Sequence, residues 1–397
     1  MKDKLKRYSL IYFLYFCVFL AIGGLDKVIA LYFNNTENGA AYYGFFLTAM
    51  SLVEIVLPTI SNRLTARIGS KRTTYLYFAS AIIIAFALYC FNFGYVLSIA
   101  AFIIICGSRT IFNFSVGDEI NFSIDNNEKG KYFAGRDLFL YLGISLSLLV
   151  AGFIANSKGP KLAILVLSVL LVLPCVVIRF LKLGHQNTSE QKEKQAKASL
   201  RSIFRHKEFV AFLGISILGS IYGSCAIFVP FLAVEVGLNY SEILASFAGL
   251  TMINAILAFL VGGMADKKNK KTFFIIDVAS DFIPALIFAF TRNATVFFIA
   301  LIFSAVKDIF APSTFAYKYE IFGMFDDNDS KFAIAALESV TCAFTFIMPS
   351  VMGLLWNCFG SKVFIISLVT IVLSVILAVF FLPNTSNVTK ATTEETT

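Results

Sequence analysis

Nine charged side chains inside long apolar stretches are the residues of this sequence best placed to do chemistry. A Lys, Arg or Asp at the centre of a membrane helix costs about 2.5–3.5 kcal/mol on insertion scales, so such residues usually face a partner or a water-filled cavity. Carboxylates there can exchange protons, and cations there can bind an anion. The nine are Asp26, Lys27, Glu54, Arg109, Asp277, Asp281, Lys307, Asp308 and Glu338.

The stretches that carry these charges make up most of the chain. Of 397 residues, 58% are hydrophobic and 15% are charged, whereas soluble domains average about 45–50% apolar and about 25% charged residues. Twelve stretches are long enough to cross a bilayer as helices, which satisfy their own backbone hydrogen bonds in lipid. The sequence therefore predicts an all-α integral membrane protein. The twelve spans are Ser9–Phe33, Ala40–Ser61, Thr74–Asn92, Tyr95–Val116, Phe133–Ala155, Leu162–Leu183, Phe209–Val234, Ile243–Met264, Phe273–Phe290, Ala294–Tyr317, Phe332–Trp356 and Val363–Leu382.

The net charge of +8 follows from the positions of the basic residues. Twelve spans place both termini on one side, and that side carries 26 lysines and arginines against 4 on the other. Cytoplasmic loops carry an excess of Lys and Arg, so both termini are predicted to be cytoplasmic. The positive balance is thus a topology signal, and nucleic-acid binding is not expected.

One polar stretch divides the spans into six and six. Gly184–Lys207 is rich in charge and has no long apolar run. The predicted domains are an N-terminal six-helix bundle (1–183), a cytoplasmic linker (184–208), a C-terminal six-helix bundle (209–382) and a cytoplasmic tail (383–397).

Metal, nucleotide and cofactor chemistry have no motif here. The seven cysteines are scattered without a CxxC pair, and neither histidine, His185 nor His206, lies in a span. A phosphate-binding G-x-x-x-x-G-K-[ST] loop is also missing from the sequence. No metal and no cofactor are predicted.

The two halves of the sequence resemble each other at an offset of about 200 residues. Lys131 recurs as Lys331, and Glu119 recurs one position later as Glu320. The two glutamates are expected to pair with basic loop residues. Duplicated six-helix halves are a common transporter architecture, with a substrate site near the midplane.

The repeat also carries a motif. After the eighth span, 262–271 reads GGMADKKNKK, and after the second span, 62–71 reads NRLTARIGSK. Both copies resemble the G-x-L-a-D-r-x-G-r-k signature of the major facilitator superfamily, although the first has Asn62 and Ala66 in place of the glycine and the acid. The resemblance implies a conformational latch at the motif residues, namely Arg67, Gly69, Lys71, Gly262, Asp266 and Lys270.

The resemblance also implies which spans line the cavity. Helices 1, 4, 7 and 10 do so in this family, which favours Asp26, Arg109, Lys307 and Asp308 as substrate-cavity or coupling residues. Equal depth along the spans, at about 1.5 Å per residue, permits a Glu54–Arg109 pair and a Lys307–Glu338 pair. Structural salt bridges are the alternative interpretation of both pairs.

Asp277 and Asp281 lie on a helix that is peripheral in the family. Their i,i+4 spacing places them on one helix face, where two carboxylates repel each other. We therefore expect one of them to be protonated or paired with Lys307.

The predicted function is transport of a small molecule by alternating access, not enzymatic catalysis. Proton-coupled efflux of a drug-like or amphipathic compound is the first hypothesis, with Asp26 or Glu338 as proton carrier. Proton-coupled uptake or exchange of a small anionic metabolite is the alternative, and a membrane enzyme or non-transporting sensor is a remote one. The expected setting is a monomer in a bacterial plasma membrane, with lipid, substrate and protons as its partners.

Overall fold

The computed structural model of this chain describes residues 2–122, 129–181, 203–261, 270–304, 311–325 and 327–384. All regular secondary structure in these residues is helical, which confirms the predicted all-α class. Nine helical stretches among them are long and apolar enough to cross a membrane. The last of these, Ala333–Phe381, holds two helices that turn back at Gly360, where φ is 56°.

The chain folds into two compact units. Unit 1 contains Met1–Ser189 and Pro230–Ala255, and unit 2 contains Glu190–Val229 and Ile256–Thr397. The helices up to residue 181 are α1 (Lys2–Ile22), α2 (Leu25–Asn34), α3 (Gly39–Ile68), α4 (Ser70–Cys90), α5 (Tyr95–Phe112), the π-helix η1 (Asn113–Gly117), α6 (Asp118–Phe122), α7 (Lys129–Lys158), α8 (Pro160–Val169) and α9 (Val172–Phe180). The helices after residue 203 are α11 (Lys207–Ala226), α12 (Val229–Glu235), α13 (Tyr240–Val261), α14 (Lys270–Ser280), α15 (Phe282–Phe290), α16 (Ala294–Ser304), α17 (Ala311–Phe322), α18 (Asp327–Phe359), the 3-10 turn η5 (Gly360–Val363) and α19 (Phe364–Phe381).

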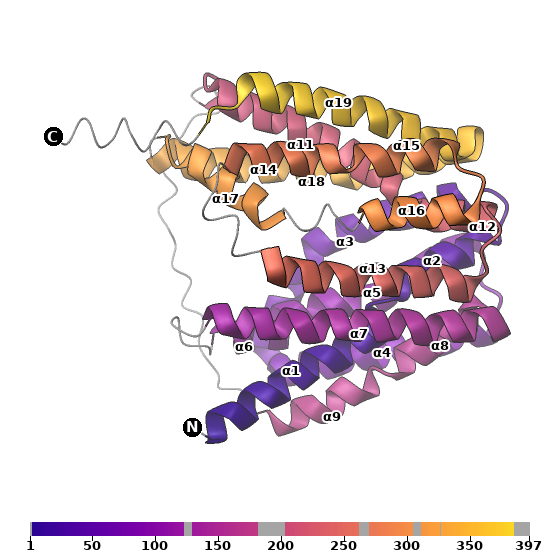
Figure 1. Cartoon of the computed structure of the whole chain (residues 1–397). Helices are drawn as coiled ribbons and strands as arrows, with labels where there is room; N and C mark the ends of the chain where they lie inside the picture. The colour runs from indigo at the N-terminus through magenta and orange to yellow at the C-terminus, as the bar shows by residue number, and fades with distance from the viewer. Residues whose placement is uncertain are drawn as a thin grey trace. The chain divides into compact units, whose positions relative to one another are not determined.

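Small residues bring α1 and α7 together in unit 1 (Figure 1). A Cβ atom at Gly143 would lie 2.7 Å from the Phe16 carbonyl oxygen, and one at Gly23 would lie 2.9 Å from the Ile144 Cα. The N–H of Gly24 donates to Ser147 Oγ at 3.0 Å, within the turn that separates α1 from α2. Glycine therefore sets the distance between these helices and lets the first span break at its middle.

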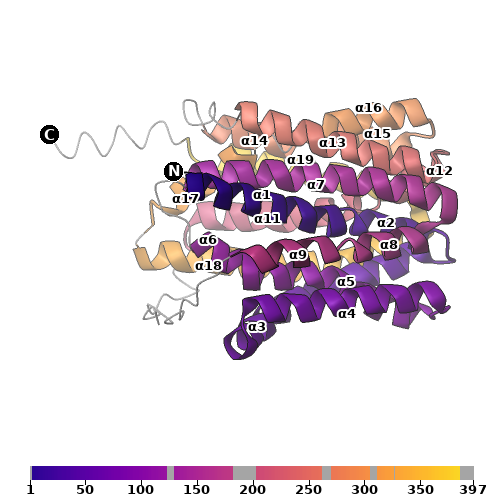
Figure 2. The same cartoon turned by 90° about the horizontal axis from the view of Figure 1, so that it is seen from below.

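Aromatic rings fill the core of unit 1. Phe102 of α5 packs edge-on against Phe33 of α2 at 5.5 Å and against Phe46 of α3 at 6.0 Å between ring centroids. All three side chains are at most 1% exposed. These contacts hold α2, α3 and α5 together, and Figure 2 shows α3 and α4 side by side in the same unit.

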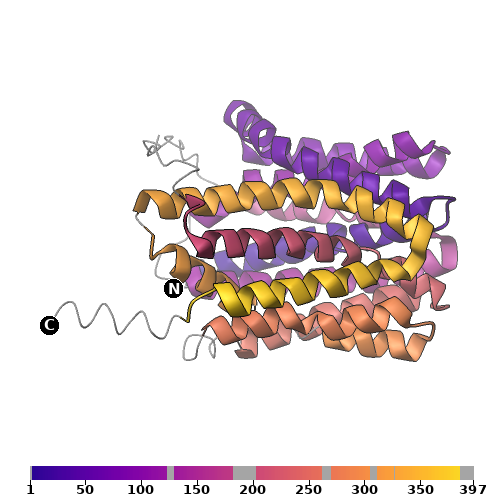
Figure 3. The ribbon, with the colours of Figure 1, turned by 90° about the horizontal axis from the view of Figure 1, so that it is seen from above.

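Unit 2 has its own aromatic core. Phe212 of α11 lies 5.5 Å from Phe274 of α14, 5.9 Å from Tyr317 of α17 and 5.3 Å from Phe322, measured between ring centroids. Figure 3 shows α11 between α18 and α19, the two helices it packs against. Helix α11 is thus the central helix of this core, because it packs against α14, α17, α18 and α19.

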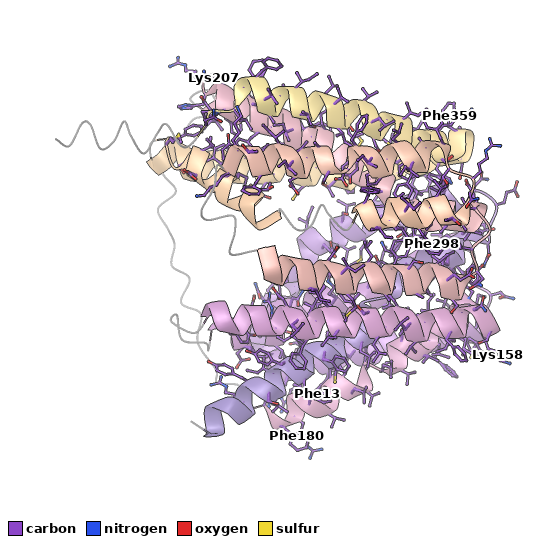
Figure 4. All side chains as sticks on the ribbon, in the orientation of Figure 1. Phe13, Lys158, Phe180, Lys207, Phe298 and Phe359 are labelled. Carbon is purple, nitrogen blue, oxygen red and sulfur yellow. The ribbon has the colours of Figure 1, made fainter. Side chains whose placement is uncertain are left out.

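Large apolar side chains cover the outside of both units, as lipid requires. Phe13 and Phe180 in unit 1 and Phe359 in unit 2 are 49%, 68% and 60% exposed, and Figure 4 marks their positions. Because this surface suits hydrocarbon, any exposed polar group at the same depth needs another explanation.

Candidate functional site

Asp26 and Lys27 lie in the first turn of α2, directly after the Gly23–Gly24 break. Lys27 Nζ and Asp26 Oδ2 form an ion pair at 3.2 Å, and the Asp26 side chain is 51% exposed. The hydroxyl of Tyr43 donates to the Asp26 backbone oxygen at 3.3 Å. Asp26 therefore reaches the surface of unit 1 with its charge balanced by its neighbour.

Two cations of unit 1 lie over aromatic rings. Lys27 Nζ is 5.3 Å from the centroid of Phe247 on α13, and Arg109 Cζ is 5.9 Å from that of Phe19 on α1. Such contacts contribute roughly 0.5–1 kcal/mol at exposed sites. They orient both cations, and a ring supplies no counter-charge.

The side chain of Glu54 is exposed, and it has no ion-pair partner among the residues that the structure describes. Residues three, four and seven positions apart along a helix lie on one face. Met50, Leu57 and Ser61 stand at these spacings from Glu54, and all three are buried. Glu54 thus emerges from the packed face of its helix and not from the lipid-facing side.

Arg109 repeats this pattern on α5. Its side chain is exposed, yet Phe102, Ile105 and Phe112, which share its helix face by the same spacing, are fully buried. Among the described residues Arg109 forms no ion pair, so the predicted Glu54–Arg109 salt bridge is not present. Its guanidinium contacts the Phe19 ring instead.

Cys106 lies close to three of the predicted site charges. Its thiol lies within electrostatic reach of Asp26, Arg109 and Glu54. Glu54 is 15 residues from the start of α3 and Arg109 is 14 residues from the start of α5. The difference of one residue is about 1.5 Å along a helix axis. Unit 1 therefore presents one region with separated positive and negative charge at membrane depth.

The π-helix η1 follows Arg109 by one turn. Its Ser115 hydroxyl contacts Ile111 O at 2.6 Å, and it lies 2.7 Å from the Thr74 hydroxyl on α4. Single π-turns inside helices are frequent at functional sites. This one changes the rotation of the helix between Arg109 and Glu119.

Unit 2 contributes a groove of about 410 Å³ between α11 and α18. Ser220 is central to it, with its hydroxyl 3.3 Å from Thr345 Oγ1 of α18. The lining residues carry hydroxyls or no side chain, apart from one isoleucine, and none is charged. They are Ser216, Gly219, Ser220, Gly223, Ser224, Ile227, Thr341 and Thr345.

Sequence reasoning did not identify these groove residues. The signal was present in the spacing of Ser216, Ser220 and Ser224, which recur at every fourth position and so share one helix face. Small residues at this spacing also serve helix packing. Only the groove shows that this face of α11 is open.

The predicted latch lies at one end of unit 1. Gly69 has φ 86° between α3 and α4, a conformation that favours glycine. Ser70 donates to Glu119 Oε2, and Lys71 Nζ donates to the Leu181 carbonyl at 2.5 Å. Arg67, in the last turn of α3, is exposed.

Unit 2 repeats these contacts about 200 residues later. Lys270 forms an ion pair with Glu320 at 2.7 Å, and Lys271 Nζ donates to the Leu382 carbonyl at 2.5 Å. The expected pairing of Glu320 with a basic loop residue is confirmed. Lys71 and Lys271 each bond the carbonyl that follows the last helix of their half, α9 or α19.

In the described residues, the two predicted latch regions differ in the group that contacts the glutamate. Glu320 forms an ion pair with the Lys270 ammonium, whereas Glu119 accepts a hydrogen bond from the neutral hydroxyl of Ser70. The second oxygen of Glu119, Oε1, is buried and has no hydrogen-bond partner in the described part of the chain. Among these residues Glu119 therefore lacks the basic partner that the sequence predicts.

Glu338 forms an ion pair with Lys318 at 2.5 Å. The predicted Lys307–Glu338 pair stays a prediction, because Lys307 lies outside the described residues. Lys318 lies near the end of α17 and its side chain is only 13% exposed. Asp277 accepts a hydrogen bond from Thr314 at 2.7 Å, and Asp281 is buried at the turn between α14 and α15.

Four predicted site residues fall outside the described ranges, namely Gly262, Asp266, Lys307 and Asp308. Within those ranges, no three His, Cys, Asp or Glu side chains gather as metal ligands.

Taken together, two helical units with apolar outer surfaces and polar faces at membrane depth define a multi-pass membrane transporter fold. The model of the Major Facilitator Superfamily matches residues 11–320. The chain belongs to this superfamily, which makes it a transporter and not an enzyme.

Solved structures agree on the fold. The nucleoside transporter NupG superposes with a TM-score of 0.68 at 14% identity, covering 94% of this chain and 98% of that chain. A bacterial homolog of the human lysosomal transporter Spinster, in an inward-facing and unoccupied conformation, superposes with a TM-score of 0.63 at 12% identity. This match covers 94% of this chain and 95% of that chain. No curated protein sequence matches the chain.

Proposed function

We propose that this protein moves a small polar organic solute across the plasma membrane by alternating access, driven by a proton gradient. The observation that carries this proposal is the exposed charge of Glu54 and Arg109, neither of which forms an ion pair with a described residue, on helix faces that otherwise pack. Charge at that depth is costly unless it meets water or substrate. The groove between α11 and α18 exposes mostly apolar surface, and the paired hydroxyls of Ser220 and Thr345 are polar contacts that it offers to the organic part of such a solute.

Efflux of a drug-like compound, the first hypothesis from the sequence, is the competing function. It rests on the aromatic content of the cavity helices. Phe102 and Phe112, however, are fully buried in the packing of α5, while the exposed groups on that helix face include a guanidinium. These contacts favour a polar solute over a lipophilic one.

The nucleoside transporter among the structural neighbours makes nucleosides the first solutes to test. The proton carrier in this proposal is Asp26 or Glu338, both of which are at least half exposed. Each has a lysine partner, so proton uptake would release that lysine. Both chain ends are placed in the cytoplasm by the proposal, as the charge distribution predicts.

Counterflow in proteoliposomes tests this function. Vesicles are preloaded with a nucleoside, a sugar, an organic anion or a lipophilic amine, and exchange of the labelled solute is measured with and without a pH gradient. We expect saturable exchange of a polar solute, accumulation that a proton ionophore abolishes, and a loss of about tenfold in Ser220→Val. Ser157→Val, at an exposed helix end, serves as the matched control. Exchange confined to the lipophilic amine would establish drug transport instead.

A further inference from the structure

Glu54 and Arg109 have opposite charges and equal depth, yet they do not neutralise each other. Their distances along α3 and α5 agree within one residue. Helices α3 and α5 pack directly, with Leu57 of α3 against Gly107 of α5. The closest approach of their charged atoms nevertheless exceeds the ion-pair distance, since these two described side chains form no pair.

Lipid exposure does not explain these two side chains. The large exposed apolar residues nearest to Glu54 in sequence are Leu52, Ile55 and Val56, and residues one or two positions apart on a helix do not face the same way. On α5, the exposed Leu97 and Ile104 also fall outside the i, i+3, i+4, i+7 spacing that would place them beside Arg109. Both charges therefore lie on the packed faces of their helices and not among the lipid-facing side chains.

Other charges in this region are already balanced. Asp26 pairs with Lys27, and that lysine also lies over Phe247. Cys106, within reach of both Glu54 and Arg109, is a small side chain one turn before Arg109. In the described part of this region, one carboxylate and one guanidinium are thus left to meet a ligand.

We propose, building on the transport function above, that the solute is a zwitterion held by Arg109 at its anionic group and by Glu54 at its cationic group. A simple anion would satisfy Arg109 but would be repelled by Glu54, and a simple cation would meet the opposite conflict. A neutral solute would leave both charges without a counter-charge. A compound with an ammonium and a carboxylate, such as an amino acid, gives each side chain a charge-assisted hydrogen bond.

The geometry of Arg109 suits the anionic end. A guanidinium binds a carboxylate through two parallel N–H groups in one plane. The centroid of the Phe19 ring lies 5.9 Å from Arg109 Cζ, so this ring limits the positions open to the guanidinium. Phe19 is buried and is itself fixed by packing.

Counterflow with three forms of one solute set tests the inference. Proteoliposomes with the full chain are assayed with labelled amino acids, with their methyl esters, which are cations, and with their N-acetyl derivatives, which are anions. We expect amino acids to exchange at least about tenfold faster than either derivative. Truncating one partner of a hydrogen-bonded charge pair costs about 2 kcal/mol or more, so Glu54→Gln and Arg109→Gln should each slow amino-acid exchange by about 30-fold or more.

The variants should also shift the preference in opposite directions. Glu54→Gln should raise exchange of the N-acetyl anion relative to the amino acid, and Arg109→Gln should raise that of the ester. Glu54→Asp should retain the zwitterion preference. Glu37→Gln and Arg292→Gln, both exposed in turns between helices, are the matched controls, and thermal unfolding verifies that every variant is folded.

Three results overturn the inference. Equal exchange of the three forms, or an unchanged preference in both variants, would remove the zwitterion site. Exchange of a nucleoside or sugar without exchange of amino acids would do so while leaving the transport function intact. No exchange of any solute would instead refute the proposed function itself.

Discussion

The glutamates at the two predicted latches, Glu119 and Glu320, provide a matched experiment within one chain. Glu119 and Glu320 occupy equivalent positions in the two halves. Glu320 Oε2 lies 2.7 Å from the Lys270 ammonium, whereas Glu119 accepts a hydrogen bond from the neutral hydroxyl of Ser70. Replacing each glutamate by glutamine removes the charge and keeps the shape. We expect Glu320→Gln to destabilise its unit more than Glu119→Gln does.

The magnitude follows from burial. The Lys270 and Glu320 side chains are 28% and 33% exposed, so the pair belongs at the upper end of the surface range, about 1 kcal/mol. Glu119→Gln removes a charge whose buried Oε1 has no partner among the described residues, and the Ser70 hydroxyl can still donate to the amide oxygen. Its expected effect is below about 0.5 kcal/mol, because the lost charge-assisted bond is offset by the lost desolvation cost.

Thermal unfolding of the purified variants in detergent measures the difference. One kcal/mol shifts the midpoint by about 2–4 °C in a block of about 150–250 residues, so Glu320→Gln should lower it by that amount. The difference should shrink in about 1 M salt, where charges are screened within about 3 Å. Glu37→Gln, in the exposed turn between α2 and α3, controls for the loss of one carboxylate. A loss in Glu119→Gln equal to that in Glu320→Gln would refute the reasoning.

Three further predictions concern single contacts. Lys71→Met and Lys271→Met each remove a charged donor from a carbonyl at a helix end, and each should cost about 1–2 kcal/mol in chemical or thermal unfolding. Gly143→Ala should reduce the yield of folded, monodisperse protein in size exclusion, whereas Gly94→Ala, with nothing within 4 Å, should not. Burial raises the pKa of Tyr132, so the neutral phenol is favoured in the fold. Stability should therefore be full below the ordinary phenol pKa of about 10 and fall as the pH rises from there towards the raised pKa, and Tyr132→Phe should flatten this alkaline decline in a pH series of unfolding midpoints.

Membrane spans and the family could be predicted because they depend on sums over many residues. A span averages hydropathy over about 20 residues, so errors at single positions cancel. The break between α1 and α2 could not be predicted in this way. It depends on Gly23 and Gly24 meeting Ile144 and Ser147, which lie far away in the chain.

Candidate site residues were identified more readily than their partners. Charge inside an apolar stretch is visible in the sequence, and Glu54 and Arg109 stand out for this reason. Equal depth, however, does not fix the angle around a helix. Glu54 therefore does not pair with Arg109 although the depths agree.

The repeat shows which latch contacts depend on the backbone and which on one side chain. Lys71 and Lys271 bond carbonyls, which every residue supplies, so this contact requires only a lysine at the right place. The carboxylate contact requires two particular side chains, and it changes character where Ser70 stands at the position of Lys270. A repeat visible in the sequence therefore predicts equivalent helix packing in the two halves, but equivalent electrostatics only where both partners recur. Unequal carboxylate contacts at the two predicted latches are therefore expected in this chain, because its two halves share a topology but Ser70 and Lys270 differ in charge.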